Sequence, residues 1–278
     1  MFDRIRMDIY RMFRSKSFYI LLFIMSAVFL MTMVPFIAMD DTDMSKEAID
    51  KIRENLSKAD VAVDLGGSVE KVIDISEYFE AILGGLFGGL FAMLFAAIFC
   101  SAEFTSGFIK NIAGQAPKRL MLVVSRSISL LIYNVLFFAY FFVFSLILNI
   151  AISRYILIED IGKFFKMVGT YFIMYYGLEL LIMMISYVTH TGVLPIIFAV
   201  LISTETAQQI ILLLQMACRR FISEDIEIVK YTLTANVGKV SDLVAQNKSL
   251  ATGLVIAVVY IAVSIAISML SIEKKDVV

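Results

Sequence analysis

The chain has 278 residues, of which 60% are hydrophobic and 18% are charged, and its formal net charge is -1. A soluble domain of this length cannot hide so much apolar surface in a single core. A net charge near zero also gives no long-range attraction to nucleic acid. The composition therefore indicates a membrane protein and argues against a nucleic-acid-binding protein.

The chain begins with a basic, amphipathic segment at residues 1–16. Phe2, Ile5 and Ile9 recur at steps of three and four between charged residues, which is typical of a helix lying along a membrane interface. The next apolar run, residues 17–39, exceeds the roughly 7–15 residues of a signal peptide, and no small-residue cleavage site follows it. We therefore expect an interfacial helix and then a retained first span. The simpler alternative is a charged flank that only anchors that span.

Six apolar runs approach or exceed the roughly 20 residues that cross a bilayer as a helix. They comprise residues 17–39, 79–101, 121–152, 167–189, 193–216 and 250–271. The predicted fold class is all-α, a polytopic membrane protein with six transmembrane helices in a single transmembrane domain over residues 1–278.

The fifth of these runs is the least regular. It contains Glu205, Gln208 and Gln209, and such polar groups inside a span usually line a cavity or an interface. We predict a crossing helix over residues 193–216. The alternative is a re-entrant segment, which leaves five spans.

The orientation follows from the basic residues near the span ends. The first 16 residues and the stretch 103–126 are densely basic, whereas residues 40–77 carry five basic side chains among eleven acidic ones. We therefore predict a plasma-membrane protein with both termini in the cytoplasm and an outer loop at 40–77. A second outer loop or re-entrant segment is expected at 217–249. Its basic residues weaken the difference in positive charge between the two membrane faces; they are Arg219, Arg220, Lys230, Lys239 and Lys248.

The second run is rich in small residues, since it contains Gly84, Gly85, Gly88 and Gly89. Glycines at this spacing let another helix approach closely, which stabilises helix pairs in a bilayer. We predict a helix-packing surface here. A hinge or a lateral opening is the functional alternative.

Glu179 and Glu205 are the informative charges, because each lies within a predicted span. An ionised carboxylate in hydrocarbon is costly unless it is paired, hydrated or protonated. Glu205 lies close to Gln208 and Gln209 and is expected on a hydrated surface. Glu179 stands between two leucines, so it is either a neutral structural group or part of a polar cavity, a subunit interface or a proton relay.

Catalytic and metal chemistry is poorly supported. The chain has one histidine, His190, and a zinc site needs three or four clustered ligands. No G-x-x-x-x-G-K-[ST] motif is present to cradle ATP phosphates. Cys100 and Cys218 are expected near opposite membrane faces and so not to form a disulfide. We therefore expect a chain that is not an enzyme and carries no cofactor of its own.

The polar stretch "EFTSGFIKNIAGQAPKR" separates the second and third runs. Its notable residues are an acid, a glycine and a basic group near a proline, namely Glu103, Gly107, Lys110, Pro117, Lys118 and Arg119. Together with six spans, inner termini, an amphipathic N-terminal helix and a glycine-rich second span, this stretch resembles the permease subunits of type-2 ABC exporters. The topology covers nearly the whole chain, whereas the motif covers about 17 residues. The charged outer segment 217–249 departs from the family pattern and leaves the substrate open.

The resemblance implies one half of a transmembrane dimer, formed by two identical or two related permeases. It also implies two separate ATP-binding subunits, which would hold the ATP and Mg²⁺. The segment 102–119 would then be the coupling helix that docks on the ATPase. Because the predicted interior is rich in Phe, Met and Leu, the expected cargo is an amphipathic peptide, an antibiotic or a lipid-like molecule, as in bacterial peptide and antibiotic exporters.

Two other classes remain as alternatives. One is a proton-coupled secondary transporter that uses Glu205 or Glu179. The other is a membrane scaffold or immunity protein that transports nothing. For the stretch 103–119 itself, the alternative is an ordinary positively charged cytoplasmic loop.

Overall fold

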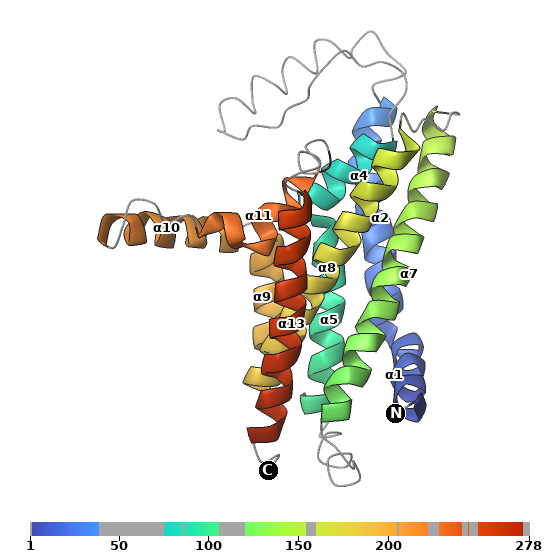
Figure 1. Cartoon of the computed structure of the whole chain (residues 1–278). Coiled ribbons are helices and arrows are strands. Elements are labelled where there is room, and N and C mark those ends of the chain that lie inside the picture. The colour runs from blue at the N-terminus through green and yellow to red at the C-terminus, as the bar shows by residue number, and fades with distance from the viewer. Residues whose placement is uncertain are drawn as a thin grey trace.

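The computed structural model describes residues 2–38, 75–85, 87–105, 120–153, 160–204, 206–221, 228–240, 244 and 250–274. Within this part of the chain every regular element is a helix, and no strand is present. Figure 1 shows a bundle of long helices with one helix projecting from its side.

The helices follow one another in the chain with these bounds: α1 (Phe2–Arg14), α2 (Lys16–Ala38), α4 (Ile75–Gly84), α5 (Phe87–Thr105), α7 (Leu120–Ser153), α8 (Ile161–Thr189), α9 (Val193–Ser203), α10 (Thr206–Phe221), the 3₁₀ turn η1 (Val229–Tyr231), α11 (Leu233–Val237) and α13 (Leu250–Lys274).

Three helices are long and apolar enough to cross a membrane, namely Leu120–Ile147 of α7, Ile161–Thr189 of α8 and Leu250–Glu273 of α13. The number rises to five if the bent pairs α1–α2 and α9–α10 each count as one span. The chain is therefore a helical protein embedded in a membrane, while the six predicted spans remain a prediction.

The N-terminal segment forms its own helix, α1, at an angle of 52° to α2. The two helices meet at Ser15, whose backbone N–H bonds to the carbonyl of Met12 while its carbonyl accepts from Phe18. Asp8 and Met12 face the bundle and are buried, whereas Tyr10 and Phe13 are exposed. A helix is thus present where the amphipathic pattern predicts one.

The second predicted span is not one continuous helix. It is divided into α4 and α5, with Gly85 as an exposed turn residue between them. The Tyr175 hydroxyl on α8 donates to the carbonyl of Leu83 at 2.5 Å, beside the break. The Tyr175 ring also fills the space where a side chain at Gly89 would lie. Glycines favour the break because they stabilise a helix poorly.

Three of the four predicted packing glycines meet neighbouring side chains. A Cβ atom at Gly84 would come within 3.0 Å of the Tyr171 hydroxyl, and one at Gly88 within 3.0 Å of Ile82. Gly89 meets Tyr175, whereas Gly85 is exposed. The close approach is therefore partly between α4 and α5 and partly between these two helices and α8.

The fifth predicted span is also wrong as a straight helix. α9 ends at Ser203, and α10 continues at an angle of 79°. Figure 1 shows α10 projecting across the long axis of the bundle. The hydroxyls of Ser203 and Thr204 each donate to the carbonyl of Val200 at 2.9 Å, and such side-chain bonds compete with continuation of a helix. The re-entrant or broken alternative fits this geometry better.

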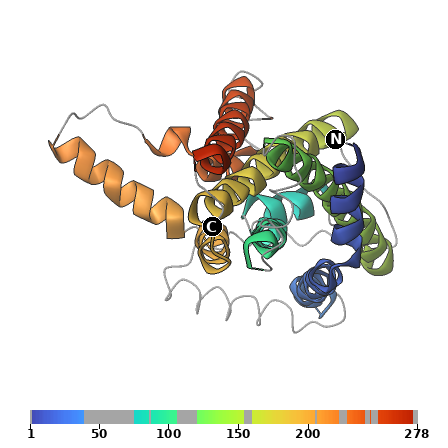
Figure 2. The same ribbon diagram turned by 90° about the horizontal axis from the view of Figure 1, so that it is seen from below.

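The centre of the bundle is α8, which packs against α13, α5, α7 and α9. Figure 2 shows α8 between α13 and α5 when the bundle is seen along its length. The core of the bundle is rich in aromatic rings. Phe95 of α5, for example, is stacked on Tyr133 of α7, with ring centroids 3.9 Å apart. The start of α1 and the end of α13 lie at the same end of the bundle (Figure 1).

Candidate functional site

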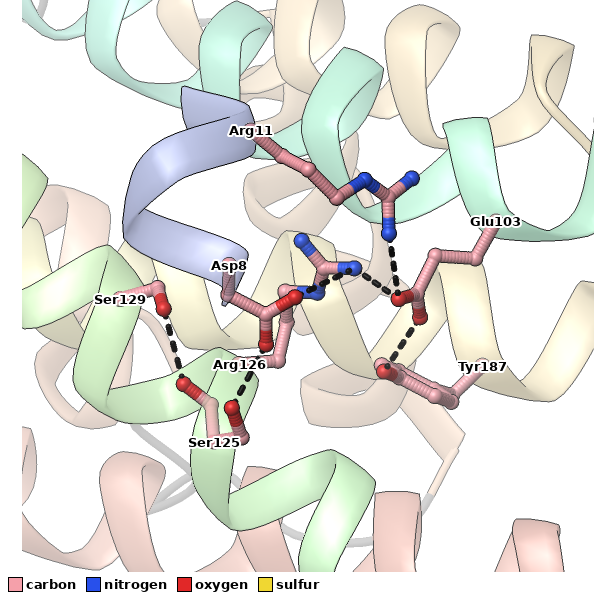
Figure 3. A network of polar contacts seen from close by, with 7 residues as sticks. All are labelled: Asp8, Arg11, Glu103, Ser125, Arg126, Ser129 and Tyr187. Carbon is pink, nitrogen blue, oxygen red and sulfur yellow. Dashed lines mark hydrogen bonds and ion pairs between the residues drawn. The ribbon is translucent and has the colours of Figure 1, made fainter. Parts of the chain in front are cut away.

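Polar side chains from four helices meet at the end of the bundle where α1 lies. We call this group the charge cluster and define it as Asp8, Arg11, Glu103, Arg126 and Tyr187 (Figure 3). Asp8 and Arg11 come from α1, Glu103 from α5, Arg126 from α7 and Tyr187 from α8. The cluster therefore joins segments that are far apart in the sequence.

Arg126 is the centre of the cluster and is fully buried. Its Nη2 atom bonds to Oε1 of Glu103 and lies 3.6 Å from Oδ1 of Asp8. Its guanidinium also lies over the ring of Phe99, 4.1 Å from the ring centroid. Two carboxylates and an aromatic face thus compensate a cation that has lost its water.

Glu103 is only 2% exposed, and both of its carboxylate oxygens accept hydrogen bonds. Oε1 accepts from Arg126 and from Nη1 of Arg11, the latter at 3.5 Å. Oε2 accepts from the Tyr187 hydroxyl at 3.3 Å. Glu103 therefore joins α5 to α1, α7 and α8 at the same time.

Asp8 anchors α1 to α7. Its Oδ2 atom accepts from the Ser125 hydroxyl at 2.6 Å. Ser129 supports the same turn of α7, because its hydroxyl donates to the backbone carbonyl of Ser125 at 3.0 Å. The α1 helix is thus tied to the bundle by hydrogen bonds and ion pairs as well as by its apolar face.

The cluster is balanced in formal charge, with two carboxylates and two guanidiniums. Buried ion pairs of this kind contribute little net stability compared with apolar packing, but removal of one partner is strongly destabilising because the other charge stays buried. The arrangement therefore specifies how four helices meet more than it adds stability.

The sequence predicts Glu103 among the residues that couple to an ATPase. In the structure its carboxylate is turned into the bundle, where it bonds to Arg126, Arg11 and Tyr187, and its coupling role stays a prediction. The remaining residues predicted for that surface, Gly107, Lys110, Pro117, Lys118 and Arg119, lie outside the described residues.

The structure brings the two flanks of that segment together. Glu103 lies just before the end of α5, Arg126 lies in the second turn of α7, and the two are directly ion-paired. One buried contact thus joins the end of α5 to the beginning of α7. Sequence reasoning missed this contact and the role of Asp8. The available signal was a lone arginine inside an apolar run, which requires an acidic partner.

The other polar candidates are not part of the cluster. Glu179 is fully buried in α8, and neither of its oxygens has a hydrogen-bond partner among the described residues. On α10, Gln208 is half-buried and Gln209 is exposed, and no hydrogen bond between described residues joins them to Glu179. Glu205 lies outside the described residues. The expected polar surface around Glu205, Gln208 and Gln209 therefore stays a prediction, and Glu179 stands apart from the glutamines among the described residues.

Among the described residues, no group of three His, Cys, Asp or Glu side chains is placed to hold a metal ion. Cys100 and Cys218 are both free thiols. His190 ends α8 in a left-handed conformation with φ of 53°, and its ring packs against Phe104 at 4.8 Å between centroids. The polar contacts that this part of the chain brings together are mainly ion pairs and hydrogen bonds between helices.

No protein-family model matches the chain, and no curated protein matches it either. The function must therefore be argued from the residues and their geometry.

Proposed function

We propose that the chain is the permease subunit of an ABC exporter, in which two separate ATP-binding subunits drive efflux of an amphipathic substrate. In this proposal six spans place both termini in the cytoplasm of a plasma-membrane protein. Two permeases, identical or related, form the pathway. ATP and Mg²⁺ bind to the partner subunits, and the cargo is a peptide, an antibiotic or a lipid-like molecule.

The observation that supports the proposal is the buried ion pair between Glu103 and Arg126. It closes the base of the segment 106–119, which is the segment expected to meet the ATPase. A force applied to a segment attached in this way acts on α5 and α7 together. Alternating access needs such a rigid connection, because a two-state assembly moves when one end is biased.

The rest of the charge cluster extends that connection. Arg11 and Asp8 attach α1 to the same ion pair, and Tyr187 attaches the end of α8. The Ser271 hydroxyl of α13 donates to the carbonyl of Tyr187 at 2.9 Å. Motion at the segment 106–119 would therefore reach α1, α5, α7, α8 and α13 as one body.

The proposal can be tested by site-specific cross-linking in cells that express the chain with its neighbouring genes. A photo-reactive residue replaces Lys110 in one variant and Lys163 in the matched control. Lys163 is an exposed lysine, with 71% of its side chain accessible, at the start of α8. We expect a cross-link from position 110, but not from position 163, to a protein that carries a P-loop sequence.

The outcome that contradicts the proposal is equally definite. If neither position captures a P-loop protein, or both capture it equally, the segment 106–119 is not an ATPase-docking surface. The control for folding is the melting temperature of each variant in the same membranes. It should equal that of the wild-type chain, which indicates that the charge cluster is intact.

A further inference from the structure

A buried carboxyl outside the charge cluster has no assigned role. Glu179 lies inside α8 and is 0% exposed. Both of its side-chain oxygens are closed to solvent and lack a hydrogen-bond partner among the described residues. An ionisable residue inside a membrane span is by default a sign of function, because its burial is costly.

Among the described residues, the helices around Glu179 place no cation in contact with its carboxyl group. The titratable groups in electrostatic range are Tyr133 on α7, Cys100 on α5 and Tyr176 on α8 itself. The tyrosine of α13, Tyr260, lies beside the backbone of α11 instead. The helices α9 and α11 carry no titratable side chain.

Arg126 is a fully buried cation of the same bundle, but it is already engaged. Its ion pairs go to Glu103 and Asp8. An ionised Glu179 would therefore be a single uncompensated charge in an apolar layer, which is strongly unfavourable. A bound proton removes that charge and needs no extra space.

From this geometry we propose that Glu179 is a proton-binding site, which holds a proton while α8 is packed against α5, α7 and α13 and releases it when those helices separate. The step is a simple exchange in which the carboxyl group loses H⁺ to water and becomes a carboxylate. Closing the bundle again requires the carboxylate to take up one proton. Opening of the bundle is thus linked to the release of one proton at a site that is closed in this conformation.

This inference does not depend on the proposed partner ATPase. It concerns a protonation state and its link to packing, and both can be measured on the purified chain. Failure of the exporter proposal would leave it standing, and its own failure would leave the exporter proposal standing.

The first test is infrared spectroscopy of the full chain in detergent micelles at about pH 7, above the ordinary Glu range near 4.3. A protonated carboxylic acid has a carbonyl stretch distinct from that of a carboxylate. We expect such a band in the wild-type chain and its loss in Glu179→Gln. The matched control is Glu273→Gln, which changes an exposed glutamate on α13 and should leave the band in place.

The second test is the pH dependence of unfolding in mixed micelles. In the folded state Glu179 binds one proton, whereas the unfolded state releases it above roughly pH 4.3. The unfolded state then binds fewer protons, so stability falls as the pH rises. Relative to Glu179→Gln, the unfolding equilibrium constant of the wild-type chain should rise about tenfold per pH unit.

Two results would overturn the proposal. One is a wild-type spectrum that loses no protonated-carboxyl band on substitution of Glu179. The other is an unfolding equilibrium constant that changes with pH in the same way for the wild-type chain and for Glu179→Gln. If Glu179→Gln does not fold, Glu179→Asp keeps a carboxyl in the same layer, and a shift of the band in this variant gives the same answer.

Discussion

Glu103 and Glu179 are both almost fully buried, yet among the described residues one has a partner for each of its oxygens and the other has none. Glu103 lies at the end of the bundle, where α1 and α7 supply arginines. Glu179 lies in the apolar interior of α8. The difference shows that burial alone does not define the role of a carboxylate, because the neighbouring charges decide whether it holds helices together or carries a proton.

The largest expected effect tests the centre of the charge cluster. Arg126→Met keeps an unbranched apolar stem but leaves Asp8 and Glu103 buried without their main cation. We expect a loss of about 3–5 kcal/mol in the free energy of unfolding, as for other buried pairs from which one partner is removed. The measurement is unfolding in mixed micelles, with Lys163→Met as a control in which an exposed pair is lost and little should change.

A loss no greater than that of the Lys163→Met control would contradict this expectation. It would mean that the cluster relaxes or hydrates without Arg126 and does not hold the four helices in a fixed arrangement.

The next prediction compares the two glutamates directly through the same chemical change. Glu103→Gln should lower the free energy of unfolding by about 1.5–3 kcal/mol, because hydrogen bonds to a charged group are replaced by neutral ones. Glu179→Gln should change it by less than about 1 kcal/mol near pH 5, because a neutral carboxyl is replaced by a neutral amide of similar size. Equal losses in the two variants would remove the distinction between the two sites.

A third prediction tests how tightly the layer near Glu179 is packed. Tyr175 is one turn before Glu179 on α8, and its ring lies where a side chain at Gly89 would be. Gly89→Ala should therefore destabilise the protein by about 1–3 kcal/mol through overpacking. Gly169→Ala is the matched control, since a Cβ atom there meets nothing within 4 Å and alanine favours the helix.

If Gly89→Ala is neutral or stabilising in thermal unfolding, the ring of Tyr175 moves aside easily. The interior would then be loose enough to admit water, and the isolation of Glu179 would be weaker than its burial suggests.

The smallest effect concerns an exposed carboxylate, the third kind in this protein. Asp160 begins α8 and accepts a hydrogen bond from the backbone N–H of Lys163 at 3.0 Å, which lowers the pKa of its carboxyl. The contribution of Asp160 to stability is therefore fully present when the pH is above the ordinary pKa of 3.8. It is lost as the pH falls through the lowered pKa of the folded state. Asp160→Asn should reduce this acid-side dependence slightly and leave stability near pH 7 almost unchanged; a large loss near pH 7 would contradict it.

Much of the helical layout could be predicted from apolar run length. The runs 121–152 and 250–271 correspond closely to α7, Leu120–Ser153, and α13, Leu250–Lys274. The start of α8 was missed by two turns, although Asp160 is a capping residue that the sequence displays. Run length indicates where a helix can exist, while capping and side-chain competition decide where it begins and ends.

The two broken runs show why continuity was harder to predict. The division between α4 and α5 depends on Tyr175 of α8, and the bend after α9 depends on hydroxyls that bond back to Val200. Both features involve a competitor for a backbone carbonyl. A hydropathy pattern carries no information about such competitors, because they are distant in the chain or only locally polar.

By itself the sequence determined that the chain is helical and lies in a membrane, because 60% hydrophobic composition and long apolar runs leave few other solutions. It also singled out Glu103 and Glu179 as unusual. Only the tertiary structure decided their environments, since Arg126 and Arg11 reach Glu103 from two other helices, whereas among the described residues neither oxygen of Glu179 has a hydrogen-bond partner. Electrostatic interactions depend on distance in space, and only folding sets those distances.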